Sequence, residues 1–228
     1  SLCPVIVGLM VSPFPCNRSV AIVTMVCALA LQVLSNLIND YYDFKKGADQ
    51  AGRVGYKRAL SEGEVSPRQI RFAIILTLCL ALITGAWLVY KGGWPILGIG
   101  LTALLFAWLY TATDHSLSYL GIADIFVFLY YGVIATMGTC YLQGCDFLYE
   151  QAFYAGSVCG LISMCVLMIN NLRDEASDSA AGKRTFVVRF GKRAGEWAML
   201  VLIMLTPVFA YCAFGLNWAM LILLPLLG

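Results

Sequence analysis

Long stretches without charge are the feature of this 228-residue chain that most limits how it can fold. A helix needs about 20 apolar residues to cross a hydrocarbon core about 30 Å thick. Hydrophobic residues make up 61% of the sequence and charged residues only 12%, proportions far from those of soluble domains. We therefore predict one all-α domain over residues 1–228, a multi-pass transmembrane bundle. Its expected spans are 19–38, 72–90, 94–113, 119–142, 152–170 and 197–214, and two short apolar pieces, 2–12 and 216–228, are expected to be cut short.

The basic residues predict how the bundle is oriented, because loops that stay in the cytoplasm are enriched in Lys and Arg. Seven of the fifteen basic residues lie between positions 45 and 71, and six lie between 173 and 193. Only Arg18 and Lys91 lie elsewhere. Counting 2–12 as the first helix, the two basic loops follow the second and sixth helices and emerge on the same side. We expect that side to face the cytoplasm.

The nine cysteines show no CxxC pair and no metal-ligand spacing. We interpret most of them as small buried apolar residues. Cys140 and Cys145 are the closest pair and lie near a non-cytoplasmic helix end, so a disulfide between them is possible. The single histidine, His115, falls in the turn "TATDHSLSY" and is interpreted as a solvated loop residue.

Two apolar stretches end in matching groups of amides and carboxylates. The first group lies in "SNLINDYYDFKKGAD" and the second in "NNLRDEASDSAAGKRT". On a helix with 3.6 residues per turn, each group falls within an arc of about 100°. Each helix therefore carries one polar stripe at its cytoplasmic end, formed by Asn36, Asn39, Asp40 and Asp43 in the first and by Asn170, Asn171, Asp174 and Asp178 in the second.

Carboxylate and amide oxygens at this spacing suit Mg²⁺, which binds through one or two carboxylates together with phosphate oxygens of a substrate. Zinc is disfavoured because usable His and Cys ligands are missing near the stripes. Lys and Arg beside the carboxylates would not help to hold a bare cation, but they fit a metal–diphosphate complex. The glycines Gly47, Gly52, Gly55 and Gly182 would let the backbone approach an anion.

Other interpretations remain open at this stage. The stripes can be solvated helix caps, since Asp and Asn are common at helix ends. A cation transporter also places carboxylates in a bundle, but it predicts them near the bilayer midplane, whereas here all but Asp124 lie in loops or at helix ends. A CDP-alcohol phosphotransferase would carry a D-G-x-x-A-R run, which the sequence lacks. A membrane scaffold leaves the matched stripes unexplained.

The motifs "NDYYDFKKGAD" and "NNLRDEASDSAAGKRTFVVRFG" resemble the two aspartate-rich motifs of the UbiA superfamily of intramembrane aromatic prenyltransferases. The resemblance extends to "SLCPVIVG" and "YLGIADIFVFLYYGVIATMGTCYLQG", and it is closest to the 1,4-dihydroxy-2-naphthoate branch of menaquinone biosynthesis. It implies a nine-helix bundle, of which seven to eight helices are represented here. It also implies Mg²⁺-dependent transfer of a polyprenyl group from a polyprenyl diphosphate to 1,4-dihydroxy-2-naphthoate, with loss of the ring carboxylate, giving demethylmenaquinone. Other acceptors of the superfamily are 4-hydroxybenzoate, homogentisate and glyceryl phosphate.

On this interpretation the partners are the lipid bilayer and the two substrates, and we expect no nucleic-acid partner. The predicted catalytic positions are Asn39, Asp43, Asp174 and Asp178. The predicted Mg²⁺ ligands are Asp40, Asp43, Asp49, Asp174 and Asp178. The predicted substrate contacts are Asn36, Lys57, Arg58, Asp124, Asn171, Lys183 and Arg184.

The chain departs from the superfamily pattern at two places. The motif N-x-x-x-D-x-x-x-D maps onto Asn39, Asp43 and Gly47, so Asp49 is the expected substitute for the third ligand. After Tyr110 the sequence "TATD" matches neither the hydroxybenzoate nor the naphthoate pattern, and no role is carried over to Asp114 or His115. Asp124 is included among the predicted substrate contacts because an ionisable group one to two turns inside a membrane helix is a functional candidate. Pairing with a lipid headgroup or a basic loop residue explains its position equally well.

Overall fold

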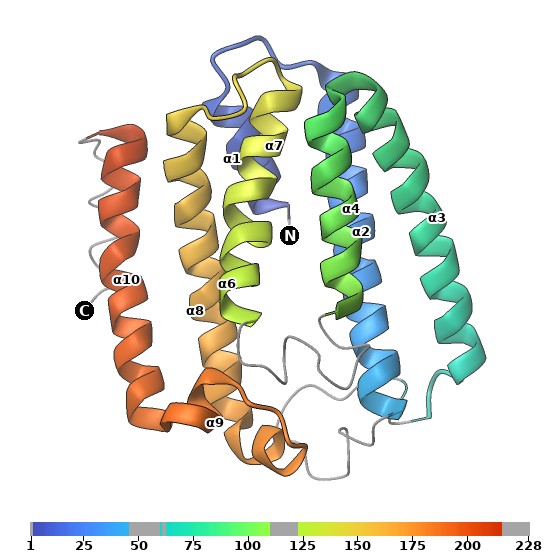
Figure 1. The fold of residues 1–228 in the computed structure, drawn as a ribbon, viewed down its shortest axis with the longest axis vertical. Helices are drawn as coiled ribbons and strands as arrows, with labels where there is room; N and C mark the ends of the chain where they lie inside the picture. The colour runs from blue at the N-terminus through green and yellow to red at the C-terminus, as the bar shows by residue number, and fades with distance from the viewer. Residues whose placement is uncertain (1, 46–59, 61–62, 110–122, 216–228) are drawn as a thin grey trace.

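The chain folds into a bundle of helices in the computed structural model, which describes residues 2–45, 60, 63–109 and 123–215 (Figure 1). No strand occurs in these ranges. The predicted all-α fold is therefore confirmed. The helices are α1 (Cys3–Val11), α2 (Arg18–Lys45), α3 (Pro67–Gly92), α4 (Trp94–Leu109), α6 (Ala123–Phe128), the π-helical turn η1 (Leu129–Val133), α7 (Ile134–Leu142), α8 (Glu150–Ala180), α9 (Phe186–Phe190) and α10 (Lys192–Phe214).

Within the described ranges, five helical segments are long and apolar enough to cross a membrane: α2, α3, the continuous segment Ala123–Leu142, α8 and α10. They correspond to five of the six predicted spans. The sixth, predicted at 94–113, is observed as the 16-residue apolar helix α4, and positions beyond Leu109 lie outside the described ranges. The described part of α1 has nine residues and is about 14 Å long.

Both acidic stripes lie on helices that continue past their apolar runs. The apolar run 19–38 belongs to α2, which extends to Lys45, and the run 152–170 belongs to α8, which extends to Ala180. Both extensions are α-helical, so their backbone keeps its helical hydrogen bonds. In Figure 1 the C-terminal ends of α2 and α8 point to the same end of the bundle, the end that carries α9.

The helices pack in two groups. One group consists of α2, α3 and α4, and the other consists of α6, η1, α7 and α10 around α8. The short helix α1 packs against α7 and α8 and also touches α2, while α7 contacts α3 and α4. Because α2 and α8 belong to different groups, a site that takes residues from both depends on how the two groups meet.

Glycines allow the segment Ala123–Leu142 to lie directly on α8. A Cβ added at Gly132 in η1 would overlap Gly160 Cα and lie 2.6 Å from Gly156 O. A Cβ at Gly160 would lie 2.6 Å from Phe128 O. Small residues let helix backbones approach closely in membranes, where apolar burial between helices contributes little. The extra residue of the π-helical turn falls at this contact.

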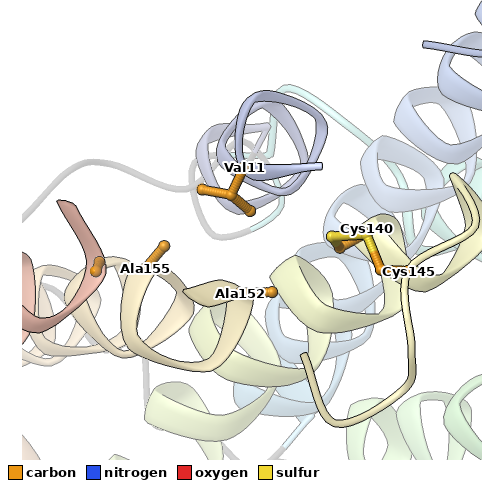
Figure 2. Close-up of a cluster of buried hydrophobic side chains, with 6 residues drawn as sticks. Val11, Cys140, Cys145, Ala152 and Ala155 are labelled. Carbon is orange, nitrogen blue, oxygen red and sulfur yellow. A yellow bond between two sulfur atoms is a disulfide. The ribbon is translucent and has the colours of Figure 1, made fainter. Parts of the chain in front are cut away.

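The opposite end of α8 carries a disulfide between Cys140 and Cys145, which joins the end of α7 to the connection that leads into α8. Both sulfurs lie in a buried cluster with Val11 of α1 and with Ala152 and Ala155 of α8 (Figure 2). The possible disulfide is therefore present in the structure. The 31 residues of α8 place this end about 46 Å from the end that carries α9.

The expectation that most cysteines are buried apolar residues is wrong for several of the free ones. Cys27 and Cys159 are buried, and Cys165 is half-buried, but Cys3, Cys16, Cys79 and Cys212 are exposed. The outer surface of this bundle is itself apolar, with residues such as Ile83 and Met204 well exposed. A cysteine on a predicted membrane helix therefore can lie on that surface as well as in the core.

The glycine contact predicts opposite effects for two Gly→Ala substitutions. Gly132→Ala inserts a methyl group into the backbone of α8 and is expected to destabilise the protein by about 1–3 kcal/mol. Gly85→Ala in α3 has no described atom within 4 Å of the added Cβ, and it is expected to be neutral or to stabilise the helix by up to about 1 kcal/mol. Denaturant titration of both variants in detergent measures the difference. Equal stability of the two variants would contradict the close contact of η1 with α8.

Candidate functional site

The two acidic stripes meet at the end of the bundle that carries α9. Lys183, in the turn after α8, places its Nζ 3.3 Å from Asp43 Oδ2 and 3.7 Å from Asp178 Oδ1. Asp43 belongs to α2 and Asp178 to α8. One ammonium group therefore joins carboxylates from both groups of helices, and the two motifs form one site.

The charged groups of the site are largely withdrawn from solvent. The side chain of Asp43 is fully buried, and those of Lys183 and Asp178 are each 14% exposed. A buried carboxylate is costly unless a cation or hydrogen-bond donors compensate its charge. One ammonium faces two carboxylates here.

Asp174 is held by its neighbour in the sequence. Arg173 donates from Nε to Asp174 Oδ1 and from a terminal nitrogen to Oδ2, with both distances 2.8 Å. Asp174 is 7% exposed, while Arg173 is 42% exposed. This two-bond geometry is the strong form of an Arg–carboxylate pair. It fixes the orientation of the Asp174 carboxylate and extends a positive charge toward the surface.

The turn after α8 positions Lys183. Gly182 has a φ of +72°, a conformation that favours glycine. The turn is closed by Lys183 N, which donates to Asp178 O at 2.9 Å. Thr185 then caps α9 by accepting a hydrogen bond from Val188 N. Val187 of α9 is fully buried, and a Cβ at Gly195 of α10 would contact it at 2.9 Å, so packing anchors the segment that carries Lys183.

The remaining predicted residues in the described ranges take different positions. On α2, Asn36 is exposed, and Asn39 and Asp40 are half-buried. On the α8 side, Asn171 is buried and lies one turn before Asp174, while Arg184 is exposed next to Lys183. Their assigned roles stay predictions. Asp49, Lys57 and Arg58 lie outside the described residues, as do Gly47, Asp114 and His115.

Asp124 is the second residue of α6. Its Oδ1 atom is buried, and no described residue donates a hydrogen bond to it. The segment Ala123–Leu142 packs on α8, and α6 begins toward the end of the bundle that carries α9 (Figure 1). A role in orienting an acceptor remains a prediction for this residue.

Three features of the site were not predicted from the sequence. Arg173 was counted only as a basic residue, although the adjacent pair Arg173–Asp174 was visible as a possible local ion pair. Lys183 was assigned to a diphosphate, but in the structure it contacts the carboxylates. Tyr42, beside Asp43, contacts Trp108 of α4 edge to face, with ring centroids 5.7 Å apart, and no sequence signal linked these two rings.

The donor chemistry of the site fits a hard divalent cation. Asp43 and Asp178 present carboxylate oxygens from two helices to a positive charge that lies between them, here the Lys183 ammonium. Carboxylate oxygens are the ligands Mg²⁺ prefers, and Mg²⁺ takes its remaining ligands from water or a phosphate-bearing substrate. In the part of the chain that the structure describes, no three acidic, His or Cys side chains are grouped closely enough to hold a metal by themselves.

Comparison with known proteins gives the same family over the whole chain. The model of the UbiA prenyltransferase family matches residues 1–228. The 1,4-dihydroxy-2-naphthoate octaprenyltransferase of Escherichia coli K12 is 38% identical over 181 residues, which are 76% of this chain and 58% of that protein. The enzyme of the same name from Haemophilus influenzae is 30% identical over 234 residues, 97% of this chain and 75% of that protein. The matched region is thus little more than half the length of the Escherichia coli relative.

The fold also matches a solved structure. A UbiA homologue from Archaeoglobus fulgidus, solved bound to DMAPP and Mg²⁺, aligns with a TM-score of 0.68 at 19% identity and covers 99% of this chain and 77% of that chain. At this identity the similarity establishes the fold.

Proposed function

The chain belongs to the UbiA prenyltransferase family, and from that premise we propose that it transfers a polyprenyl group from a polyprenyl diphosphate to 1,4-dihydroxy-2-naphthoate. The observation that carries the proposal is the contact of Lys183 with both Asp43 and Asp178. It unites the two acidic motifs at one end of a membrane bundle. The naphthoate acceptor is supported by relatives of that name with 38% and 30% identity.

In the proposed site, Asp43, Asp174 and Asp178 would hold Mg²⁺, with Asp40 and Asp49 as further ligand candidates. Bound Mg²⁺ would neutralise charge on the diphosphate leaving group and so favour cleavage of the allylic C–O bond. Asn39 and Asn171, on the same stripes, offer amide groups that can accept from or donate to neighbouring ligands. Arg173 keeps the Asp174 carboxylate oriented before substrate arrives.

The basic residues around the carboxylates would bind the diphosphate oxygens. Arg184 is exposed and adjacent to Lys183, so it is available to an incoming anion. Lys57, Arg58 and Asn36 complete the proposed set of donor contacts. The isoprenoid tail would lie along the apolar helices, where each buried methylene contributes about 0.8 kcal/mol.

The acceptor reaction needs no nucleophilic side chain. The allylic C–O bond breaks with its electron pair leaving on the diphosphate, and the electron-rich ring supplies the pair for the new C–C bond at the carbon that bears the carboxylate. Loss of that carboxylate as CO₂ returns an electron pair to the ring, giving the reduced form of demethylmenaquinone. Asp124, whose Oδ1 lacks a donor among the described residues, would accept a hydrogen bond from an acceptor hydroxyl.

A reconstituted assay tests the proposed function. Purified protein is given Mg²⁺, octaprenyl diphosphate and an equimolar mixture of 1,4-dihydroxy-2-naphthoate, 4-hydroxybenzoate and homogentisate, and mass spectrometry identifies the products. We expect diphosphate release with the prenylated naphthalene product in excess. Asp174→Ala should abolish turnover, because it removes a ligand and leaves Arg173 without its partner, while Glu196→Ala, at an exposed position of α10, should retain turnover. Diphosphate release with a different acceptor would show that the proposed acceptor is wrong. No diphosphate release with any acceptor would refute the proposed function.

We further propose that the protein lies in a bacterial inner membrane with this site facing the cytoplasm. The basic residues that gather at this end support that orientation. The Cys140–Cys145 disulfide at the opposite end supports it independently, because disulfides persist in the oxidising periplasm and are rare in the cytoplasm.

Single cysteines at the two ends test this orientation. One new cysteine at a time is introduced into a variant whose free cysteines are replaced by Ser. Leu148→Cys places it near the disulfide, and Lys192→Cys places it at the end of the bundle with the acidic stripes. Both positions are exposed. A membrane-impermeant maleimide added to intact cells should label Leu148→Cys, and it should label Lys192→Cys only after lysis. Labelling in the reverse pattern would show the opposite orientation.

A further inference from the structure

Lys183 occupies the position between the carboxylates that the proposed function assigns to a metal. Its Nζ lies 3.3 Å from Asp43 Oδ2 and 3.7 Å from Asp178 Oδ1. We propose, on the premise of that function, that Lys183 is a built-in counter-ion that stabilises the site before substrate arrives and is exchanged for metal when the diphosphate enters. It is thus a positioning residue that couples metal binding to donor binding.

The burial of Asp43 explains why a counter-ion is needed. Its side chain is fully buried at the end of a membrane bundle, where an uncompensated carboxylate is strongly unfavourable. The ammonium compensates that charge and, through Asp178, draws the ends of α2 and α8 together.

The same contact makes Lys183 a competitor of the metal. Mg²⁺ would use carboxylate oxygens that the ammonium now contacts, so binding of metal alone must displace Lys183 from them. Displacement without another anion present would leave a partly buried cation without compensation. We therefore expect the substrate-free site to bind metal weakly.

A diphosphate changes this balance because it supplies new anionic oxygens. The backbone bond from Lys183 N to Asp178 O keeps the residue at the site, while its flexible four-carbon chain lets the ammonium turn from the carboxylates to the diphosphate. Metal and diphosphate then favour each other's binding. This coupling must act equally in both directions, since linkage between two binding sites is reciprocal.

The contacts of Lys183 distinguish it from Lys192, at the same end of the bundle. Lys192 of α10 lies 3.3 Å from Glu175 Oε2, but the two side chains are 61% and 32% exposed. It forms a surface pair of the kind that contributes little to stability. Lys192→Met therefore removes a nearby positive charge without touching the Asp43–Asp178 contact, and it is the matched control for Lys183→Met.

Binding of Mn²⁺, a substitute for Mg²⁺ with an electron paramagnetic resonance signal, tests the proposal without turnover. The full chain in detergent is titrated with Mn²⁺ alone and again with saturating inorganic pyrophosphate. Without pyrophosphate, we expect Lys183→Met to bind Mn²⁺ about tenfold more tightly than wild type does. Pyrophosphate should tighten Mn²⁺ binding, and we expect this tightening to be about tenfold smaller in Lys183→Met than in wild type. Lys192→Met should match wild type in both titrations. Unchanged or weaker Mn²⁺ binding by Lys183→Met without pyrophosphate would overturn the proposal.

A second variant tests the counter-ion proposal if Lys183→Met does not accumulate as folded protein. The guanidinium of Lys183→Arg matches carboxylates better than an ammonium does, so this variant should bind Mn²⁺ alone several-fold more weakly than wild type. Equal or tighter binding by Lys183→Arg would overturn the proposal. Failure of the counter-ion proposal leaves wild-type turnover intact, whereas failure of the proposed function appears as absent diphosphate release in the wild-type protein.

Discussion

The contact of one lysine with two carboxylates from different helices is the interaction on which the site depends. Asp43 and Asp178 belong to helices that pack in separate groups, and Lys183 joins them where both helices leave the apolar part of the bundle. In a soluble protein such an ion pair would contribute little at the surface. Here the Asp43 side chain is fully buried, and a buried carboxylate is costly unless cations or hydrogen-bond donors compensate its charge.

The rest of the fold brings these groups to the same place. The long helix α8 carries Asp174 and Asp178 at one end and packs near the disulfide at the other. Close contact at Gly132 and Gly160 fixes the segment Ala123–Leu142 on α8, with α6 beginning toward the end of the bundle that carries α9 (Figure 1). The turn at Gly182 and the packing of α9 on α10 then direct Lys183 back to the carboxylates.

Much of this arrangement could be predicted from the sequence. Apolar runs of about 20 residues define membrane helices, and the number of spans between the two basic loops places both stripes on one side of the membrane. Five spans were confirmed as long apolar helices, and the family resemblance was confirmed over the whole chain. The assigned roles of Asp43, Asp174 and Asp178 stay predictions, but the structure brings Asp43 and Asp178 to one lysine as a shared site requires.

The partners of individual charges could not be predicted in the same way. Periodicity states which residues share a helix face, but it does not state how a long side chain turns, so neither the Arg173–Asp174 pair nor the inward direction of Lys183 follows from spacing. The sequence left open whether Cys140 and Cys145 are bonded, because a five-residue separation permits a disulfide without requiring it. Cysteine exposure was misjudged because both the core and the lipid-facing surface of a membrane bundle are apolar.

We propose that the ends of α2 and α8 form one metal–diphosphate site. A structure of the protein with Mn²⁺ and a non-reactive polyprenyl thiodiphosphate, with manganese located by anomalous scattering, tests it most directly. We expect manganese bound to Asp43 on one side and to Asp174 or Asp178 on the other, with the diphosphate between them and Lys183 turned onto its oxygens. Manganese or diphosphate bound elsewhere, with Lys183 still on Asp43 and Asp178, would contradict it.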